Sequence, residues 1–357
     1  MRVLVDSFAD SGLLNAQMGN AREIVRRLDP TQFHVSMFLA GKPHPSLSER
    51  ANIRFIRLPK RGQTINILRE FCWGDHDLVF YLKSSPASRW YMAFRKKWGD
   101  ARPIIGTMES QSDLRNEPTI SPTAIRLWEH TVLRCDYLFS NSRSVQNSLH
   151  REYGLKSQII PTGVDTKFFL PAKHRQANVR PRVLFVGSLR PFKQPQLLLD
   201  AAKQFPEADF RIVGDGPLRP ELQSEIAQKR LSNVVLAGSV DAEQLRDEYR
   251  AADVFLFPSN WEGSPKVILE AAACGLPAIV HSSYAPETVQ HGVTGYQAHT
   301  NEQIFEFLAA LLASHELCQK LGANARNLSL RYDWDIIAGQ WAEVLTNLAI
   351  PAARKAS

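Results

Sequence analysis

The segment VFLFPSNWEGSPKVILEAAACGLPAIV (residues 254–280) predicts a strand, a loop, a helix and a second strand. Its apolar start, Val254–Phe257, is typical of a strand buried on both faces. Ser264 is a good N-cap residue, Pro265 suits the first helical position, and Gly275 ends a helix. A strand, a helix and another strand form the repeating unit of a parallel sheet covered by helices.

The same alternation extends over the whole chain. We expect strands at residues 2–6, 34–39, 78–83, 103–108, 137–140, 182–186, 210–213, 234–237, 254–257 and 278–281, with helices at 20–28, 123–134, 196–204, 242–251 and 330–349. Between them, residues 160–181 show no clear period, so they are the best linker candidate. We therefore predict an α/β protein with two Rossmann-like, doubly wound domains facing a cleft, at 1–165 and 176–334.

Composition narrows the class of protein. A length of 357 residues with 44% hydrophobic residues indicates two globular domains rather than a disordered or fibrous chain. No apolar run reaches the ~18–20 residues of a membrane span, and the start lacks the apolar stretch of a secretory signal. The four cysteines are far apart and form no CxxC pair, which argues against structural zinc and disulfides. We therefore expect a cytoplasmic protein with no metal, no cofactor and no nucleic-acid module.

The charge is uneven along the chain. Residues 1–175 hold 26 Lys and Arg against 16 Asp and Glu, which predicts an anionic ligand or surface near the first half. In this half, Trp90, Phe94 and Trp98 fall on one stripe of an expected helix, next to a run of three cations. We interpret the stripe as core. The alternative is a peripheral helix that lies on anionic lipid at the inner face of a membrane.

Two carboxylates flank the expected helix start at Ser264. Glu262 lies in the loop before it, and Glu270 lies roughly 9 Å along the helix axis at ~1.5 Å per residue. Between them are the amides of residues 263–267, and a helix start can hold a phosphate through its N–H groups. This layout suits a sugar joined through a diphosphate to a ribose. The plain alternative is a pair of solvated acids.

These residues resemble the E-x7-E motif of retaining glycosyltransferase family 4, whose members have the two-domain GT-B fold. Further similar segments are DYLFSNS (136–142), IIPTGVD (159–165), VGSLRPFKQ (186–194), VGDGP (213–217) and the loop at 286–296. The resemblance covers most of the chain and implies that the last helix, 335–357, crosses back to the first domain. It also implies a nucleotide-diphosphate sugar as donor and retention of the anomeric configuration.

The resemblance assigns roles to individual residues. Glu270 would bind the ribose hydroxyls, Glu262 the donor sugar, and Lys193 the diphosphate. The family's arginine after Gly187 is Ser188 here, and Arg190 is close enough to substitute for it. The remaining expected donor-binding residues are Gly12, Gly187, Gly214, Gly216, Gly263, Ser264, Pro265, Lys266 and Val267.

One catalytic position departs from the family. PIIGTMES (103–110) resembles the strand that ends in Thr-x-His, but Glu109 stands in the place of the histidine. A carboxylate there could stabilise an oxocarbenium-like transition state or bind an acceptor hydroxyl. We expect Glu109 to be catalytic, together with Glu262 and Lys193. Asp113 is an alternative base.

The sequence thus predicts a retaining, hexosyltransferase-type glycosyltransferase of polysaccharide or glycolipid synthesis. Its partners would be a nucleotide-sugar donor, a carbohydrate or lipid-linked acceptor, and an anionic membrane surface. Two alternatives remain: a nucleotide-sugar epimerase on the same fold, or a non-catalytic nucleotide-sugar-binding subunit.

Overall fold

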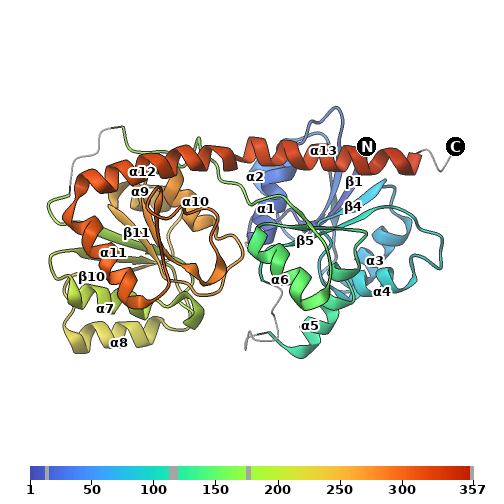
Figure 1. Ribbon diagram of the computed structural model, residues 1–357. Helices are drawn as coiled ribbons and strands as arrows, with labels where there is room; N and C mark the ends of the chain where they lie inside the picture. Colours follow the sequence, from blue (N-terminus) through green and yellow to red (C-terminus); the bar gives the residue numbers. More distant parts are fainter. Residues whose placement is uncertain (13–15, 112–119, 174–177, 354–357) are drawn as a thin grey trace. The chain divides into compact units, whose positions relative to one another are not determined.

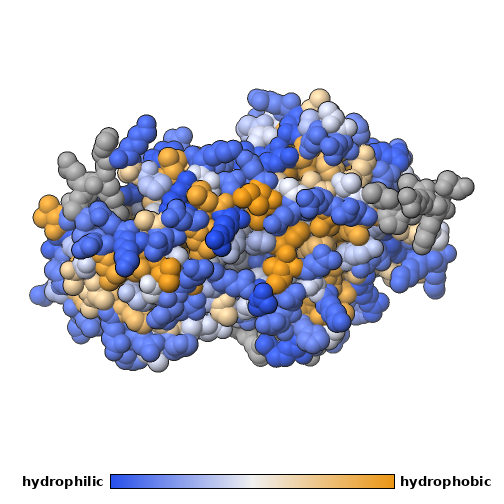
Figure 2. Space-filling view, turned by 45° about the horizontal axis from the view of Figure 1, so that its top comes forward, coloured by the Kyte–Doolittle hydropathy of each residue, from blue (hydrophilic) through white to orange (hydrophobic). Residues whose placement is uncertain are grey.

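The protein contains two parallel sheets, and helices cover both faces of each sheet (Figure 1). Strands that are buried on both faces have continuous apolar sequences, which explains the short apolar runs. The computed structural model describes residues 1–12, 16–111, 120–173 and 178–353. The chain divides into two units: Met1–Thr162 with Trp334–Ser357, and Gly163–Asp333. Blue, hydrophilic residues cover most of the face seen in Figure 2, and apolar residues gather there in patches.

The first unit contains a seven-stranded sheet of order β3-β2-β1-β4-β5-β6-β7, with every pair parallel. Its elements are β1 (Arg2–Phe8), α1 (Ala16–Val25), β2 (His34–Leu39), α2 (Pro45–Ser48), β3 (Ile53–Arg57), α3 (Gln63–Trp73), β4 (Leu78–Phe80), α4 (Pro86–Phe94), β5 (Ile104–Met108), α5 (Pro122–Glu129), η2 (Val132–Arg134), β6 (Tyr137–Ser140), α6 (Arg143–Tyr153), β7 (Gln158–Ile159) and α13 (Trp334–Ala353).

The second unit contains a six-stranded parallel sheet of order β10-β9-β8-β11-β12-β13. Its elements are β8 (Arg182–Val186), η3 (Pro191–Lys193), α7 (Gln196–Gln204), β9 (Asp209–Val213), α8 (Arg219–Lys229), β10 (Val234–Gly238), α9 (Ala242–Ala251), β11 (Val254–Phe257), α10 (Lys266–Ala273), β12 (Ala278–His281), η4 (Ser282–Tyr284), β13 (Gly295–Ala298), α11 (Asn301–Ala313), α12 (His315–Ser329) and η5 (Leu330–Tyr332). Two doubly wound sheets confirm the predicted α/β class.

The C-terminal helix α13 completes the core of the first unit. Its buried residues Trp334, Ile337, Trp341 and Leu345 follow one helical stripe and pack with residues of β1, β2 and β4. The Trp341 ring lies 4.9 Å from the ring of Phe80 and 4.8 Å from that of Phe139, between centroids. The helix begins later than the expected residue 330, because η5 precedes it.

Several boundaries differ from the expectations for local reasons. The strand predicted at 78–83 ends at Phe80, because Tyr81 has a left-handed backbone with φ 63°. The helix predicted at 123–134 ends at Glu129 and is followed by the separate turn η2. The three strands that the pattern missed, β3, β7 and β13, lie at sheet edges, and β7 has only two residues.

Candidate functional site

The order of the second sheet changes direction at β8. Chain connections run from β8 toward β9 on one side and, later in the chain, reach β11 on the other side. Ligands of doubly wound proteins bind beyond the carboxyl ends of the strands at such a switch point. The loops that follow β8 and β11 carry Lys193 and Glu262, so the sheet order itself places these two residues at the expected binding edge.

Backbone contacts fix the loops at this edge. Gly214 has φ 130°, and a Cβ there would lie 2.0 Å from the carbonyl oxygen of Gly187, so only glycine fits. A Cβ on Gly216 would lie 2.6 Å from the carbonyl oxygen of Leu189. The N–H of Leu189 donates to the carbonyl of Asp215 at 3.0 Å. The predicted glycine turns therefore hold the β8 and β9 loops against each other.

The β8 loop is also tied to the β11 loop. The N–H of Asn260 donates to the carbonyl of Phe192 at 3.0 Å, and the Ser259 hydroxyl oxygen lies 3.2 Å from the same carbonyl oxygen. These contacts bring Lys193 Nζ into an ion pair with Glu262 Oε1, to which the Ser259 hydroxyl donates at 2.6 Å. The side chains of Lys193 and Glu262 are 14% and 12% exposed, so the pair is largely shielded from water.

Aromatic rings surround the lysine of this pair. Lys193 Nζ lies 4.8 Å from the centroid of the Phe257 ring and 5.3 Å from that of Phe192. Cation–π attraction holds the ammonium group in place without neutralising its charge. The site thus presents a positioned cation that an anionic ligand could approach.

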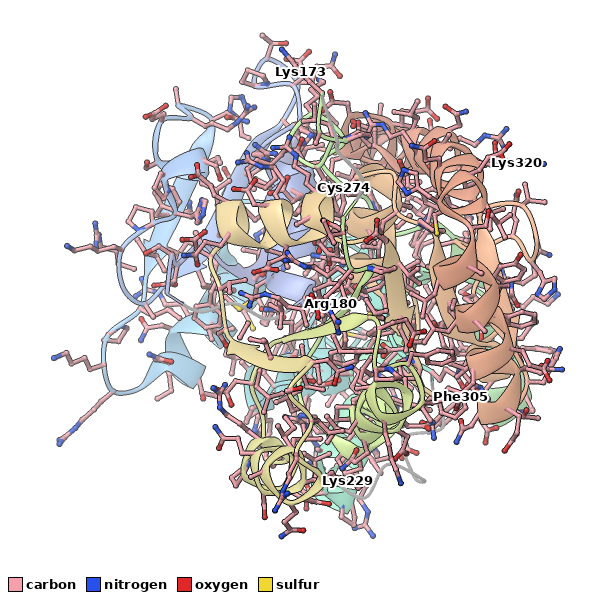
Figure 3. All side chains as sticks on the ribbon, turned by 90° about the vertical axis from the view of Figure 1, so that its left-hand side faces the viewer. Lys173, Arg180, Lys229, Cys274, Phe305 and Lys320 are labelled. Carbon is pink, nitrogen blue, oxygen red and sulfur yellow. The ribbon has the colours of Figure 1, made fainter. Side chains whose placement is uncertain are left out.

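The predicted cap of helix α10 is wrong. The helix begins at Lys266 with Pro265 as its N-cap, and Ser264 lies outside the helix. Pro265 has an extended ψ of 119°, which moves the first helical residue one position along, and as the N-cap residue it makes no side-chain capping hydrogen bond. Val267 lies in that turn and Gly263 in the loop before it. Figure 3 labels Cys274 at the other end of this helix.

Glu270 lies inside α10 and has a partner that the sequence did not reveal. The Tyr249 hydroxyl, from the last turns of α9, donates to Glu270 Oε2 at 3.0 Å. Burial raises the pKa of the Glu270 carboxyl, while the charge of Lys266 and the Tyr249 hydrogen bond act in the opposite direction. Glu262 and Glu270 therefore differ: the first is paired with a cation, the second is held by a neutral hydroxyl.

Two other residues that were expected to bind the donor are exposed to solvent. Arg190 is exposed, as the residue before η3, and in the described part of the chain it forms no ion pair. Gly12 is exposed in the first unit, and a Cβ there would meet no described residue within 4 Å.

The first unit has its own polar cluster, at the carboxyl ends of β4 and β5. Glu109 directly follows β5, and the Tyr81 hydroxyl donates to Glu109 Oε1. The Asn141 side-chain amide donates to the Glu109 carbonyl oxygen at 3.1 Å. Burial and the Glu109 charge raise the pKa of Tyr81 well above its ordinary value, so this hydroxyl remains a donor.

A small cavity adjoins the carboxylate. Its volume of about 20 Å³ can hold one water molecule. The side-chain oxygens Oδ1 of Asn20 and Asn141, whose residues line the cavity, are buried and accept no hydrogen bond from the described residues. Such orphaned acceptors favour a polar occupant next to Glu109.

Asp6 and Lys83 extend the cluster, and the sequence did not single them out. The backbone N–H of Lys83 donates to Asp6 Oδ2 at 2.8 Å across the β1–β4 switch point. Burial raises the pKa of Asp6 to about 6. Burial lowers the pKa of Lys83, and the negative charges of Asp6 and Glu109 act in the opposite direction.

Asp113 lies outside the described residues. Among the described residues, no group of His, Cys, Asp and Glu is arranged to hold a metal ion.

Asp6 gives a pH-dependent prediction. Its folded-state pKa of about 6 lies above the ordinary 3.8, so protonated Asp6 contributes stability that is complete below about pH 4 and lost as the pH rises through about 6. We expect Asp6→Asn to raise the free energy of unfolding by up to ~3 kcal/mol near pH 8 and very little near pH 4. Denaturation of both proteins at the two pH values checks this, with the exposed Asp75→Asn as control. An equal gain at both values would contradict it.

The fold and the clusters at its switch points define a class of protein. Sucrose-phosphate synthase from Thermosynechococcus elongatus superposes with a TM-score of 0.79 at 21% identity, covering 97% of this chain and 98% of that one. Anabaena Alr3699/HepE in complex with UDP and glucose gives 0.77 at 19%, covering 97% and 100%. The chain is thus an α/β protein of the GT-B type.

Sequence comparison identifies the family of the chain. The family models for glycosyl transferases group 1 and for Glycosyltransferase Family 4 match residues 166–328 and 20–168. The D-inositol 3-phosphate glycosyltransferases of Thermobispora bispora and Streptomyces scabiei are each 31% identical over 71% and 76% of this chain. The chain belongs to this group 1, family 4 class of glycosyltransferases. It covers 66% and 68% of those two relatives, about two-thirds of their length.

No helix among the described residues is both long and apolar enough to pass through a bilayer.

Proposed function

We propose that the protein transfers a hexosyl group from a nucleotide-diphosphate sugar to an acceptor hydroxyl, with retention of the anomeric configuration. The observation that carries the proposal is the shielded Lys193–Glu262 pair at the switch point of the second sheet. An ammonium group there can neutralise a diphosphate, while the carboxylate accepts hydrogen bonds from sugar hydroxyls. Three structures of Anabaena Alr3699/HepE similar to this chain are complexes with UDP and glucose, UDP, or UDP-glucose, which supports a uridine donor.

The remaining residues of the second unit fit the same donor. The N-cap residue of α10, Pro265, makes no side-chain capping hydrogen bond, and the amide edge of a helix start suits a phosphate. Glu270, half-buried and held by Tyr249, offers a second acceptor oxygen for the ribose hydroxyls. The glycine turns at Gly187 and Gly214 let backbone approach the ligand closely.

In the first unit, Glu109 supplies the negative charge. We place its carboxylate beside the developing positive charge of an oxocarbenium-like transition state, where a fixed anion lowers the barrier. Tyr81 and Asn141 orient the glutamate through its side chain and its carbonyl. Lys83 and Asp6 lie in the same cluster and set its local charge.

We propose an acceptor hydroxyl on a carbohydrate or a lipid-linked carbohydrate in polysaccharide or glycolipid synthesis. The relatives are named for D-inositol 3-phosphate, so a phosphorylated polyol belongs among the acceptors to be tested. Neither the epimerase nor the non-catalytic alternative finds support among these relatives.

A panel of nucleotide sugars, assayed by thermal shift and then by transfer, tests the proposal. We expect one donor to stabilise the protein, and the product linkage to keep the donor's anomeric configuration by nuclear magnetic resonance. An isomerised sugar formed from donor alone would identify an epimerase. Donor binding with neither hydrolysis nor transfer to any acceptor would identify a binding subunit.

Lys193→Ala is expected to weaken binding of UDP by about 10- to 150-fold, the loss of a charge-assisted contact worth ~1.5–3 kcal/mol. Glu262→Gln releases Lys193 from its ion pair, so we expect it to keep or strengthen UDP binding while losing transfer. Isothermal titration of both variants checks this, with the exposed Lys203→Ala as control. UDP affinity that is unchanged in Lys193→Ala would contradict the phosphate role.

A further inference from the structure

The aromatic stripe of the first half is not core. Trp90 and Trp98 are each 57% exposed, and Trp73 at the end of α3 is 79% exposed. The interpretation of the stripe as core is therefore wrong for Trp90 and Trp98, whereas Phe94 is half-buried. Periodicity shows that residues share a helix face but not which way that face points. Exposure of three indoles on one surface is energetically unfavourable in water, and such an apolar patch indicates an interaction site.

Helix α3, helix α4 and the turn that follows α4 carry these indoles, and Trp73 and Trp98 line the same hollow. Phe71 of α3 stacks on Tyr91 of α4 at 5.1 Å between centroids, and both rings are buried, so the helices are packed together. Figure 1 shows the two helices side by side on the first unit. On α3 the exposed residues are Thr64, Ile65, Arg69 and Trp73.

The aromatic rings on α4 and in the turn that follows it are held in a fixed arrangement. The rings of Trp90 and Phe94 stack at 5.5 Å, and those of Phe94 and Trp98 at 5.7 Å. Lys97 Nζ lies 5.9 Å from the Phe94 centroid. A stacked ladder loses little side-chain entropy when it binds, so the surface is prepared for contact.

The charge of this surface is predominantly positive. The segments 57–73 and 81–100 contain nine Lys and Arg but only two acidic residues, Glu70 and Asp100, and each of these is paired with an arginine outside the nine. Seven of these cations are exposed, and none of the seven forms an ion pair with the described residues: Arg57, Lys60, Arg61, Arg69, Arg89, Lys96 and Lys97. In contrast, the buried Arg95 is neutralised by Asp136 at 2.7 Å. The exposed cations are therefore available to bind an external anion.

A hollow lies at one end of the surface. It has a volume of about 760 Å³ and is lined by Trp73, Trp98, Tyr137 and Leu348, among others. The hollow borders the amino ends of β5 and β6, whereas Glu109 lies at the carboxyl end of β5. It is therefore separate from the polar cluster around Glu109 and offers an apolar recess.

We propose that this α3–α4 face docks on an anionic lipid bilayer. Tryptophan is favoured at the membrane–water interface because its indole is apolar with one polar N–H group. Lysine and arginine beside it are attracted to anionic head groups. A surface that combines exposed indoles with unopposed cations matches this partner in both respects. Vesicle binding requires neither donor nor transfer, so this proposal stands or fails separately from the proposed activity.

Flotation of the full chain with vesicles tests the docking. Wild type should float with phosphatidylcholine–phosphatidylglycerol vesicles and not with phosphatidylcholine alone. Replacing Lys96 and Lys97 by glutamine should weaken binding by ~30-fold, the effect of two lost surface cations. The matched control replaces Lys203 and Lys320, two exposed lysines of the second unit, and should bind as wild type does; Figure 3 labels Lys320.

Brominated lipid probes the indoles. It should quench tryptophan fluorescence of wild type, and a Trp73, Trp90 and Trp98 triple alanine variant should lose most of that quenching. Because the three side chains are exposed, the variant should keep its thermal transition, which shows that it is folded. Flotation without anionic lipid dependence, or equal binding of the Lys96/Lys97 variant and the control, would overturn the proposal. So would a dimer in solution that the triple variant abolishes, because a second copy would then cover the face.

Discussion

Glu109→Gln is expected to lower kcat by about 10²- to 10³-fold, the usual cost of removing one preorganised electrostatic contact to a transition state. Glutamine has the same shape, and its amide oxygen can still accept the hydrogen bond from Tyr81. The substitution therefore removes the charge and leaves the geometry of the cluster. Steady-state kinetics with donor and acceptor varied separately measure the effect.

Two further variants separate the roles of Glu109. Tyr81→Phe removes only the hydroxyl that orients the carboxylate, so its effect on kcat should be smaller than that of Glu109→Gln. Glu49→Gln, at an exposed position, serves as control. A raised acceptor KM with unchanged kcat would assign Glu109 to acceptor binding instead, and normal kinetics in Glu109→Gln would remove it from the site.

Trp341→Ala should lower the free energy of unfolding of the first unit by about 3–5 kcal/mol, the cost of deleting a large buried aromatic side chain. Trp341 is 4% exposed and packs against rings from β4 and β6. Hydrogen exchange resolves the two units, and we expect faster exchange in β1, β2 and β4 but not in β8 to β12. Trp73→Ala, at a position 79% exposed, is the matched control and should change stability by less than ~0.5 kcal/mol. Unaltered exchange in β1 and β4 would show that α13 is not part of that core.

The bounds of an element can be predicted from the sequence where a single physical cause determines them. The predicted bounds of β2, β6, β8, β11 and β12 agree with the structure, because strands buried on both faces read as continuous apolar runs. Gly275 was identified as the end of α10 and has φ 77°, a conformation that favours glycine. The missed edge strands have fewer buried residues and so carry a weaker signal.

The candidate site was only partly accessible to the same reasoning. Motifs predicted Glu109, Glu262, Glu270 and Lys193 as site residues, and the structure pairs Lys193 with Glu262. Asp6 and Lys83 were missed because they are 77 positions apart and meet only when β1 and β4 pair, which no local pattern records.

The place of α13 in the first core has a consequence for protein synthesis. Domains usually fold in order from the amino terminus as the chain leaves the ribosome. Here the first unit lacks Trp334, Trp341 and Leu345 until almost the whole chain has been translated, whereas Gly163–Asp333 is one uninterrupted segment. The second unit should therefore fold first, and the nascent β1–β7 sheet should depend on chaperones until the last helix emerges.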